Sequence, residues 1–121
     1  GHASIIGDGV LIINEGQFES NGFGKLQITA PRQGPYTGLV FYQPKTNTQT
    51  VTINTPAVIA GTLYLPNAKF LKGGVTKAVI GSVVADTAEI SGANELIIEG
   101  APFYVPAPAA GTTRKPAPRK R

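Results

Sequence analysis

Three phrases of sequence decide the fold of this chain: Gly38-Leu-Val-Phe-Tyr-Gln-Pro44, Gly61-Thr-Leu-Tyr-Leu-Pro66 and Gly81-Ser-Val-Val-Ala-Asp86. Each is a Gly, then three to five apolar or β-branched residues, then a turn. An earlier copy is Gly9-Val-Leu-Ile-Ile-Asn14, and a looser late copy is Gly100-Ala-Pro-Phe-Tyr-Val-Pro106. From Gly38 onward the spacings are 23, 20 and 19 residues, so the chain contains an internal repeat of about twenty residues.

Two more strand-like runs follow the Gly phrase within each repeat. These runs are residues 50–54 and 57–60, then 68–71 and 77–80, then 88–91 and 95–98. Turn-forming pairs such as Pro66-Asn67 and Gly73-Gly74 separate them. Three strands of about four residues per repeat predict a chain that turns three corners in each lap.

Alternation within the runs predicts one buried and one exposed side. Leu26 and Ile28 alternate with Gln27 and Thr29, for example. Strands of neighbouring laps would pair, and their apolar side chains would stack in an interior that no single repeat can bury alone. The sequence therefore predicts an all-β chain, a β-solenoid (β-helix) with a repeat of about 20 residues.

A β-sandwich is the alternative fold, because it also uses short strands with a turn every 8–12 residues or so. Two features favour it over the solenoid. The first spacing, from Gly9 to Gly38, is 29 residues, and a Pro-rich stretch at residues 30–37 interrupts the pattern. That stretch is either an inserted loop or a corner between two sheets.

Composition divides the chain into three parts. Residues 1–3 include Gly1 and His2, which are typical of a cleaved expression tag, so the single histidine is given no chemical role. Residues 4–105 form the predicted β-repeat domain. From Pro106 to Arg121 no apolar residue is larger than Ala, which predicts a disordered, extended Pro/Ala/basic tail.

The positive charge of the chain comes from this tail. The formal net charge is +4, yet six basic and seven acidic residues precede the last eight positions. Five basic residues lie in those last positions: Arg114, Lys115, Arg119, Lys120 and Arg121. A salt-dependent contact with an anionic polymer or a membrane surface is one expectation for them, and a solubilising linker is the other. Specific nucleic-acid binding is not expected, because the tail has no aromatic residue to stack on a base.

The sequence offers little chemistry for an enzyme. It has no Cys, which excludes disulfides, thiolate catalysis and Cys-ligated zinc. The best carboxylate cluster is Asp86, Glu89, Glu95 and Glu99, with Lys69 or Lys72 expected on the neighbouring lap. A solvated outer face with charge pairs explains this cluster more simply than a catalytic groove does. We therefore expect a non-enzymatic protein without catalytic residues, metal or cofactor.

Aromatic residues and the first lap supply the candidate contact residues. Phe41 and Tyr42 must face opposite sides of a strand, so we expect Tyr42 and Tyr64 to stack outward on adjacent laps. Such a pair is either simple stacking or a partner- or carbohydrate-binding ladder. At the C-terminal end, Glu and Pro residues block strand addition, whereas residues 4–13 contain no Pro and only Asp8 as a charge. We expect the N-terminal lap, with Ile12, to bind a protein partner or a second copy.

Three phrases of the sequence occur in the order found in a known bacterial family. They are residues 28–43, with the Ala30-Pro31 and Tyr42-Gln43 pairs, residues 60–69, and Glu89-Ile-Ser-Gly-Ala-Asn-Glu-Leu96. The chain resembles in this way the C-terminal region of Tad/Flp pilus-assembly proteins of the TadE/TadG-like type. The resemblance implies a structural or assembly role in the bacterial cell envelope or outside the cell.

A weaker resemblance is to bactofilins, through the repeating Gly-apolar phrases and the Pro-rich basic end. It implies a polymer-forming cytoskeletal solenoid, which would be cytoplasmic. A carbohydrate-binding or carbohydrate-active β-helix is the third function consistent with the expected fold.

Overall fold

The structure, a computed structural model, describes residues 4–22 and 24–100 of the chain. Within these residues it consists of nine β-strands and no helix, joined in one parallel sheet. No segment among the described residues is therefore a helix able to cross a membrane. The strands are β1 (Ile5–Asp8), β2 (Ile12–Ile13), β3 (Phe18–Ser20), β4 (Leu26–Thr29), β5 (Leu39–Tyr42), β6 (Val51–Ile53), β7 (Ala57–Lys72), β8 (Lys77–Ile90) and β9 (Glu95–Ile98).

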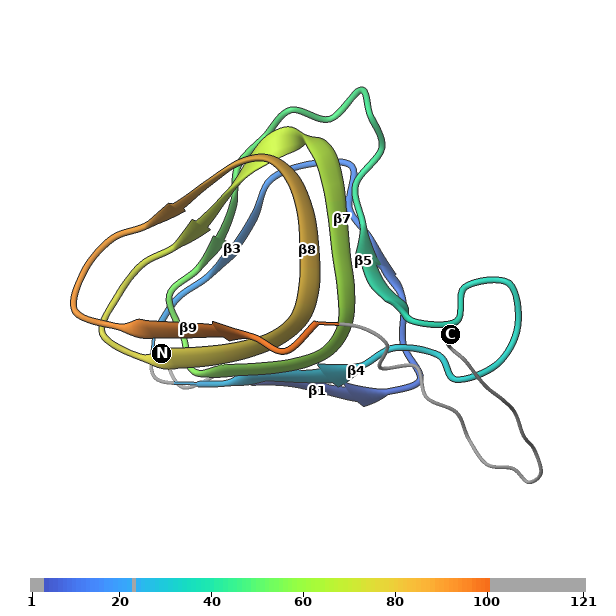
Figure 1. Cartoon of the computed structure of the whole chain (residues 1–121), viewed down its shortest axis with the longest axis horizontal. Coiled ribbons are helices and arrows are strands. Elements are labelled where there is room, and N and C mark those ends of the chain that lie inside the picture. Colours follow the sequence, from blue (N-terminus) through green and yellow to red (C-terminus); the bar gives the residue numbers. More distant parts are fainter. Residues whose placement is uncertain (1–3, 23, 101–121) are drawn as a thin grey trace.

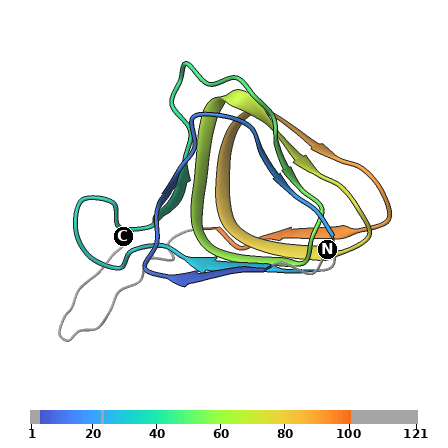
Figure 2. The same ribbon diagram turned by 180° about the vertical axis from the view of Figure 1, so that it is seen from behind.

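The strands wind into stacked coils of triangular outline (Figures 1 and 2). The first coil holds β1 to β3 and the second holds β4 to β6; β7 and β8 bend around corners and make one coil each, and β9 begins a fifth. The first face contains β1, β4, the starts of β7 and β8, and β9. The second face contains β2, β5 and the middle parts of β7 and β8. The third face contains β3, β6 and the last parts of β7 and β8.

This arrangement is a β-solenoid, and the predicted fold is confirmed. Partner residues Ile5 and Leu26 are 21 positions apart, as are Ala57 and Ala78, which agrees with the predicted repeat of about 20 residues. A β-sandwich would pair antiparallel strands, whereas every pair of strands here is parallel.

The glycines of the repeated phrase lie at one corner of successive coils, as predicted. Leu39 pairs with Thr62 and Thr62 with Ser82, so Gly38, Gly61 and Gly81 occupy equivalent positions. At Gly61 a β-carbon would lie 2.8 Å from the Ala30 Cβ and 2.9 Å from the Val40 Cβ. Coils can approach this closely at the corner only because the residue there has no side chain.

The interior is a set of apolar columns that run from coil to coil. One column on the first face contains Ile28, Ile59 and Ile80, all at most 2% exposed. The interior of the other two faces combines aliphatic and aromatic residues, and Phe41 contacts Phe18 with ring centroids 5.2 Å apart. The buried apolar residues are Leu26, Ile28, Ala30, Val40, Phe41, Val51, Ile53, Ala57, Ile59, Leu63, Leu65, Ala68, Phe70, Ala78 and Ile80. Burial of these columns between neighbouring coils is the main source of stability for such a fold.

Two loops in the second coil explain the irregular early spacing. Leu26 and its partner Ala57 are 31 positions apart because extra residues lie between β4 and β5 and between β5 and β6. Figure 1 shows both loops projecting from the triangle. The Pro-rich break is thus an inserted loop. Arg32 of this loop forms an exposed ion pair with Asp8, the last residue of β1.

Candidate interaction surfaces

The second face carries an outward aromatic pair, as predicted. Tyr42 and Tyr64 belong to neighbouring coils, and their rings lie 5.6 Å apart between centroids and 6° from parallel. Ile13 pairs with Tyr42 and Val84 pairs with Tyr64. These four side chains, Ile13, Tyr42, Tyr64 and Val84, form the tyrosine column, which spans all four coils of this face. Phe41, next to Tyr42 in the chain, points inward and is 2% exposed, as alternation requires.

The direction of the tyrosine rings bears on what they can bind. Because the rings stack along the solenoid, each ring has the other ring on one side, and the register places Ile13 and Val84 on the remaining sides. A sugar-binding platform needs an open ring face, and here the stacking covers one face of each ring. The geometry therefore favours stacking between coils and contact with a protein over a carbohydrate platform.

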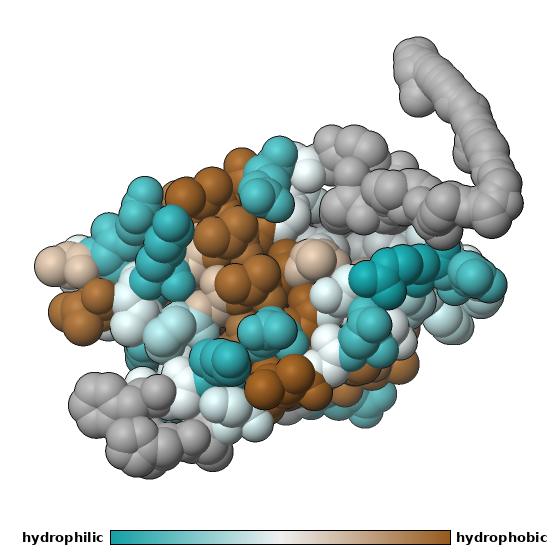
Figure 3. All heavy atoms as spheres, turned by 90° about the horizontal axis from the view of Figure 1, so that it is seen from below, coloured by the Kyte–Doolittle hydropathy of each residue, from teal (hydrophilic) through white to brown (hydrophobic). Residues whose placement is uncertain are grey.

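A second outward column, apolar except at Gln27, lies on the first face, and sequence reasoning missed it. The register joins Ile6, Gln27, Val58, Val79 and Ile97, a set that we call the first-face column. Ile6 is 63% exposed and Val58 is 53% exposed. Figure 3 views this face and shows a band of apolar side chains between polar ones. The run Ala57-Val-Ile-Ala60 is apolar at every position, so alternation could not reveal which side chains point outward.

The third face is mainly polar on its outside. Glu19 pairs with Thr52, and Leu71 pairs with Glu89. Lys69 forms an ion pair with Glu89 of the neighbouring coil, at a surface position where such pairs contribute at most about 1 kcal/mol. The predicted contact of Glu89 with Lys69 is confirmed. Lys72, the other lysine considered, lies instead in the interior.

Lys72 occupies a position that is apolar in the adjacent coils. It pairs with Ile53 below and Ile90 above, and the residue is 0% exposed. Its Nζ donates hydrogen bonds to the Gly73 carbonyl oxygen at 2.7 Å and to the Thr76 Oγ1 at 3.3 Å. Burial lowers the pKa of this ammonium from its ordinary value of 10.5.

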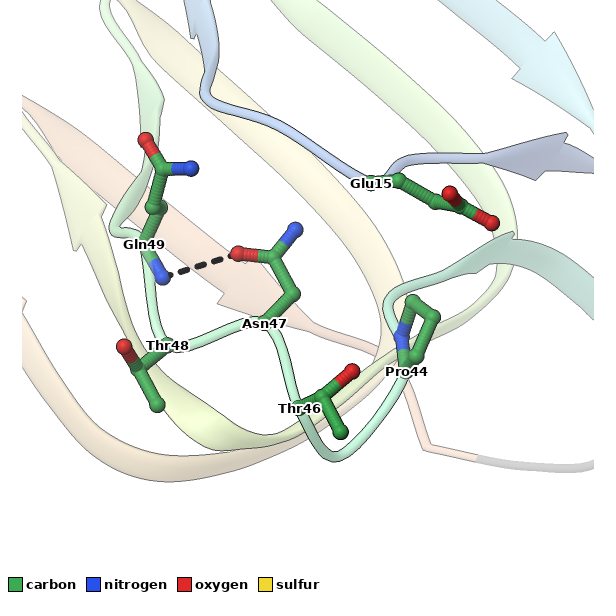
Figure 4. A pocket seen from close by; sticks show the side chains of 6 residues that line it. All are labelled: Glu15, Pro44, Thr46, Asn47, Thr48 and Gln49. Atoms are coloured by element: carbon green, nitrogen blue, oxygen red, sulfur yellow. Dashed lines mark hydrogen bonds between the residues drawn. The ribbon is translucent and has the colours of Figure 1, made fainter.

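An open cavity of about 410 Å³ lies beside the loop between β5 and β6. Its lining is mainly polar, and Figure 4 shows its six residues: Glu15, Pro44, Thr46, Asn47, Thr48 and Gln49. Asn47 is committed to holding the loop, because its Nδ2 donates to the Gly16 carbonyl at 2.9 Å and its Oδ1 accepts from the Gln49 N–H at 3.0 Å. In the described part of the chain no three His, Cys, Asp or Glu residues are grouped to hold a metal ion.

The structure corrects the placement of Ile12. Ile12 pairs with the buried Phe41 and packs against the core, so it points inward. Its neighbour Ile13 is the residue exposed on the outside, at 61%. Residues 1–3, residues 101–105 of the predicted domain and the predicted tail at 106–121, with Arg114, Lys115, Arg119, Lys120 and Arg121, lie outside the described residues.

Comparison with known proteins gives no relative. No family model, no curated protein and no solved structure matches the chain.

Proposed function

We propose that this protein is a non-enzymatic structural or assembly module of the bacterial cell envelope that binds a protein partner through two of its three faces. The observation that carries the proposal is the pair of outward apolar columns on the first and second faces. Ile6, Ile13 and Val58 are each more than half exposed. The second-face column is apolar or aromatic in all four coils, and the first-face column is apolar from Val58 through Val79 to Ile97, with Gln27 between Val58 and Ile6. Large apolar side chains that continue from coil to coil are typical of contact surfaces, whereas isolated ones are ordinary.

The contrast between faces supports the same role. The third face has Glu19, Thr52 and the Lys69–Glu89 ion pair on its outside, so its outward column is mainly polar, unlike those of the first and second faces. The described residues contain six basic and seven acidic side chains, so charge does not dominate this surface. A broad and weakly charged apolar surface suits a protein partner better than an anionic polymer.

The resemblance to Tad/Flp pilus-associated proteins supplies the envelope setting. Two of its three phrases lie where the second face is built: one ends in β5 with Tyr42, and the other covers the middle of β7 with Tyr64. The residues that carry the resemblance are thus also those that form the tyrosine column. This coincidence favours the pilus-assembly role over the cytoskeletal one.

The test is a pair of charged substitutions in the bacterium that produces the protein. Val58→Lys and Val84→Lys place a charge in each outward column at exposed positions, so the fold should tolerate them. Thr52→Lys on the third face is the matched control. We expect the column variants, and deletion of the gene, to reduce surface pili in electron micrographs while the control does not. Normal pili after gene deletion would refute the envelope role, and normal pili with both column variants would refute the contact surface.

The first coil favours a second candidate, a bactofilin-like polymer. Within residues 4–22 and 24–100 nothing pairs with the outer edge of β1, and Ile5 is 48% exposed although its partner Leu26 faces the core. An open edge with apolar interior residues can accept another chain. Light scattering over a range of concentrations tests this: Ile5→Lys should lower the mass of any assembly, and Ser4→Lys is the control. A strictly monomeric wild-type chain would rule this candidate out.

A further inference from the structure

A hollow of about 350 Å³ opens at the C-terminal end of the solenoid. Val83, Ala85 and Leu96 face it from the last coils, and all three pack against the core while remaining only partly buried. Ile98 pairs with the fully buried Ile80, yet it is 46% exposed. The other lining residues are Phe70, Asp86, Thr87 and Ala88. The interior columns of the second and third faces thus end in an apolar space that no side chain among residues 4–22 and 24–100 fills.

The backbone around this hollow also has a free edge. β9 pairs only with Lys77–Ile80, the first-face part of β8. Along the rest of β8, no described residue pairs with the side that faces away from β7. Within residues 4–22 and 24–100 the fifth coil therefore has a first-face strand, β9, and no second-face strand, which would cover Val83 and Ala85.

The chain itself continues from the corner where that strand would begin. The Gly100 N–H donates to the Gly81 carbonyl oxygen at 2.7 Å, so Gly100 stacks on the glycine corner. The next residues repeat the phrase of the second coil: Gly38-Leu-Val-Phe-Tyr-Gln-Pro44 and Gly100-Ala-Pro-Phe-Tyr-Val-Pro106 share Gly, Phe, Tyr and Pro at the same four positions. We propose that residues 101–106 dock along β8 as the second-face strand of the fifth coil, with Phe103 in the hollow.

The register gives each side chain of this segment a place. Phe41 of the second coil pairs with Leu63, and Leu63 pairs with Val83, so these three residues form one inward column. Phe103 has the same place in its phrase as Phe41 and therefore lies over Val83, as the next member of this column. The matching Tyr104 extends the tyrosine column beyond Val84. Pro102 takes the position of Val40, where the strand pairing shifts by one residue, and such bulges tolerate a missing N–H. A cavity of roughly 150 Å³ already holds a benzene ring, so the hollow has room for Phe103.

The test measures thermal unfolding of the full chain. Phe103→Ala should lower the Tm by about 5–10 °C, since it removes a buried aromatic ring at the end of the stack. Tyr36→Ala is the matched control, because Tyr36 lies on the inserted loop and is 56% exposed. Its Tm should change by no more than about 1–2 °C.

A second substitution identifies the hollow itself. Val83→Phe should lower the Tm of the wild-type chain, where the space is filled, and raise the Tm of the Phe103→Ala chain, where it is vacant. A Phe103→Ala chain as stable as the Tyr36→Ala control would overturn the proposal. So would a Tm that rises with protein concentration in the wild type and not in Phe103→Ala, because the ring would then fill the hollow of another copy.

Discussion

Lys72 shows how a single side chain can oppose the pattern around it. The columns of the interior are apolar, and the partners of Lys72 in the coils below and above are Ile53 and Ile90. The two hydrogen bonds of its Nζ go to neutral oxygen atoms, those of Gly73 and Thr76. Neutral acceptors compensate only part of the free energy that the charged amine loses when it leaves water. The neutral form of the amine is therefore favoured, and the pKa of Lys72 is lowered.

Lys72→Met should therefore stabilise the protein. We expect the Tm at pH 7 to rise by about 5 °C, because Met keeps the length of the side chain and has no charge to bury. The folded state binds the amine proton less tightly than the unfolded chain, so wild-type stability rises with pH from the lowered pKa up to 10.5. The advantage of Lys72→Met should shrink over that window. Thermal unfolding from pH 6 to pH 10 measures both effects, with the exposed Lys77→Met as control; a variant less stable than wild type throughout would contradict the account.

Gly61 is the residue at which the coil corner is tightest. Gly61→Ala should lower the free energy of unfolding by about 2–3 kcal/mol, because its β-carbon would overlap the Ala30 and Val40 side chains and only a shift of the coils could relieve this. Gly16→Ala is the matched control, since no atom lies within 4 Å of a β-carbon there. Urea unfolding of both variants measures the difference. Equal stability of the two would show that the corner is looser than the structure indicates.

At the scale of elements, polar side chains fix the loop between β5 and β6. Gln43 follows Tyr42 and is 0% exposed, so it occupies an inward position that is polar instead of apolar. Its Nε2 donates to the carbonyl oxygens of Asn47 and Gln49, and its Oε1 accepts from the Asn14 Nδ2 at 3.0 Å. The loop leaves the solenoid at this point, and Gln43 supplies the hydrogen bonds that neighbouring strands supply elsewhere.

Gln43→Leu should cost about 1–3 kcal/mol of stability, although it makes the position apolar like its surroundings. The reason is that the partners of Gln43 would stay buried without hydrogen bonds. Gln27→Leu, at an exposed position of β4, is the control and should change stability by less than about 0.5 kcal/mol. Denaturant unfolding reports the stability, and hydrogen exchange of the amides in residues 44–50 should speed up only in Gln43→Leu. Unchanged exchange in that loop would contradict its role.

At the scale of the whole molecule, charge and folding energy come from different parts of the chain. The described residues carry a net charge of −1, and the formal +4 of the chain arises from the basic residues at its end. The core lies between Leu26 and Ile80, with partly buried residues extending it at both ends. Stability is expected to depend on the stacked coils, whereas the charge depends on the last eight residues.

Removal of residues 107–121 should separate these two properties. We expect the Tm to stay within about 2 °C of the full chain, because the removed segment has no apolar side chain larger than Ala. The isoelectric point should fall from about 9.6 into the acidic range. Differential scanning fluorimetry and isoelectric focusing test the two halves of this prediction, and a Tm loss of the size expected for Phe103→Ala would show that the basic end packs on the domain.

The sequence by itself determined the solenoid, the equivalence of Gly38, Gly61 and Gly81, and the outward Tyr42–Tyr64 stack. The first two follow from the glycine phrases that recur about every twenty residues after Gly38, and the third follows from alternation within two of those phrases. Only the tertiary structure decided that Lys72 and Ile12 point inward and that Ile6, Val58, Val79 and Ile97 form a column on the first face. The direction of a side chain in a strand depends on the register with the neighbouring coils. Where every residue of a run is apolar, or where one polar residue lies in an apolar column, the local pattern carries no information on that register.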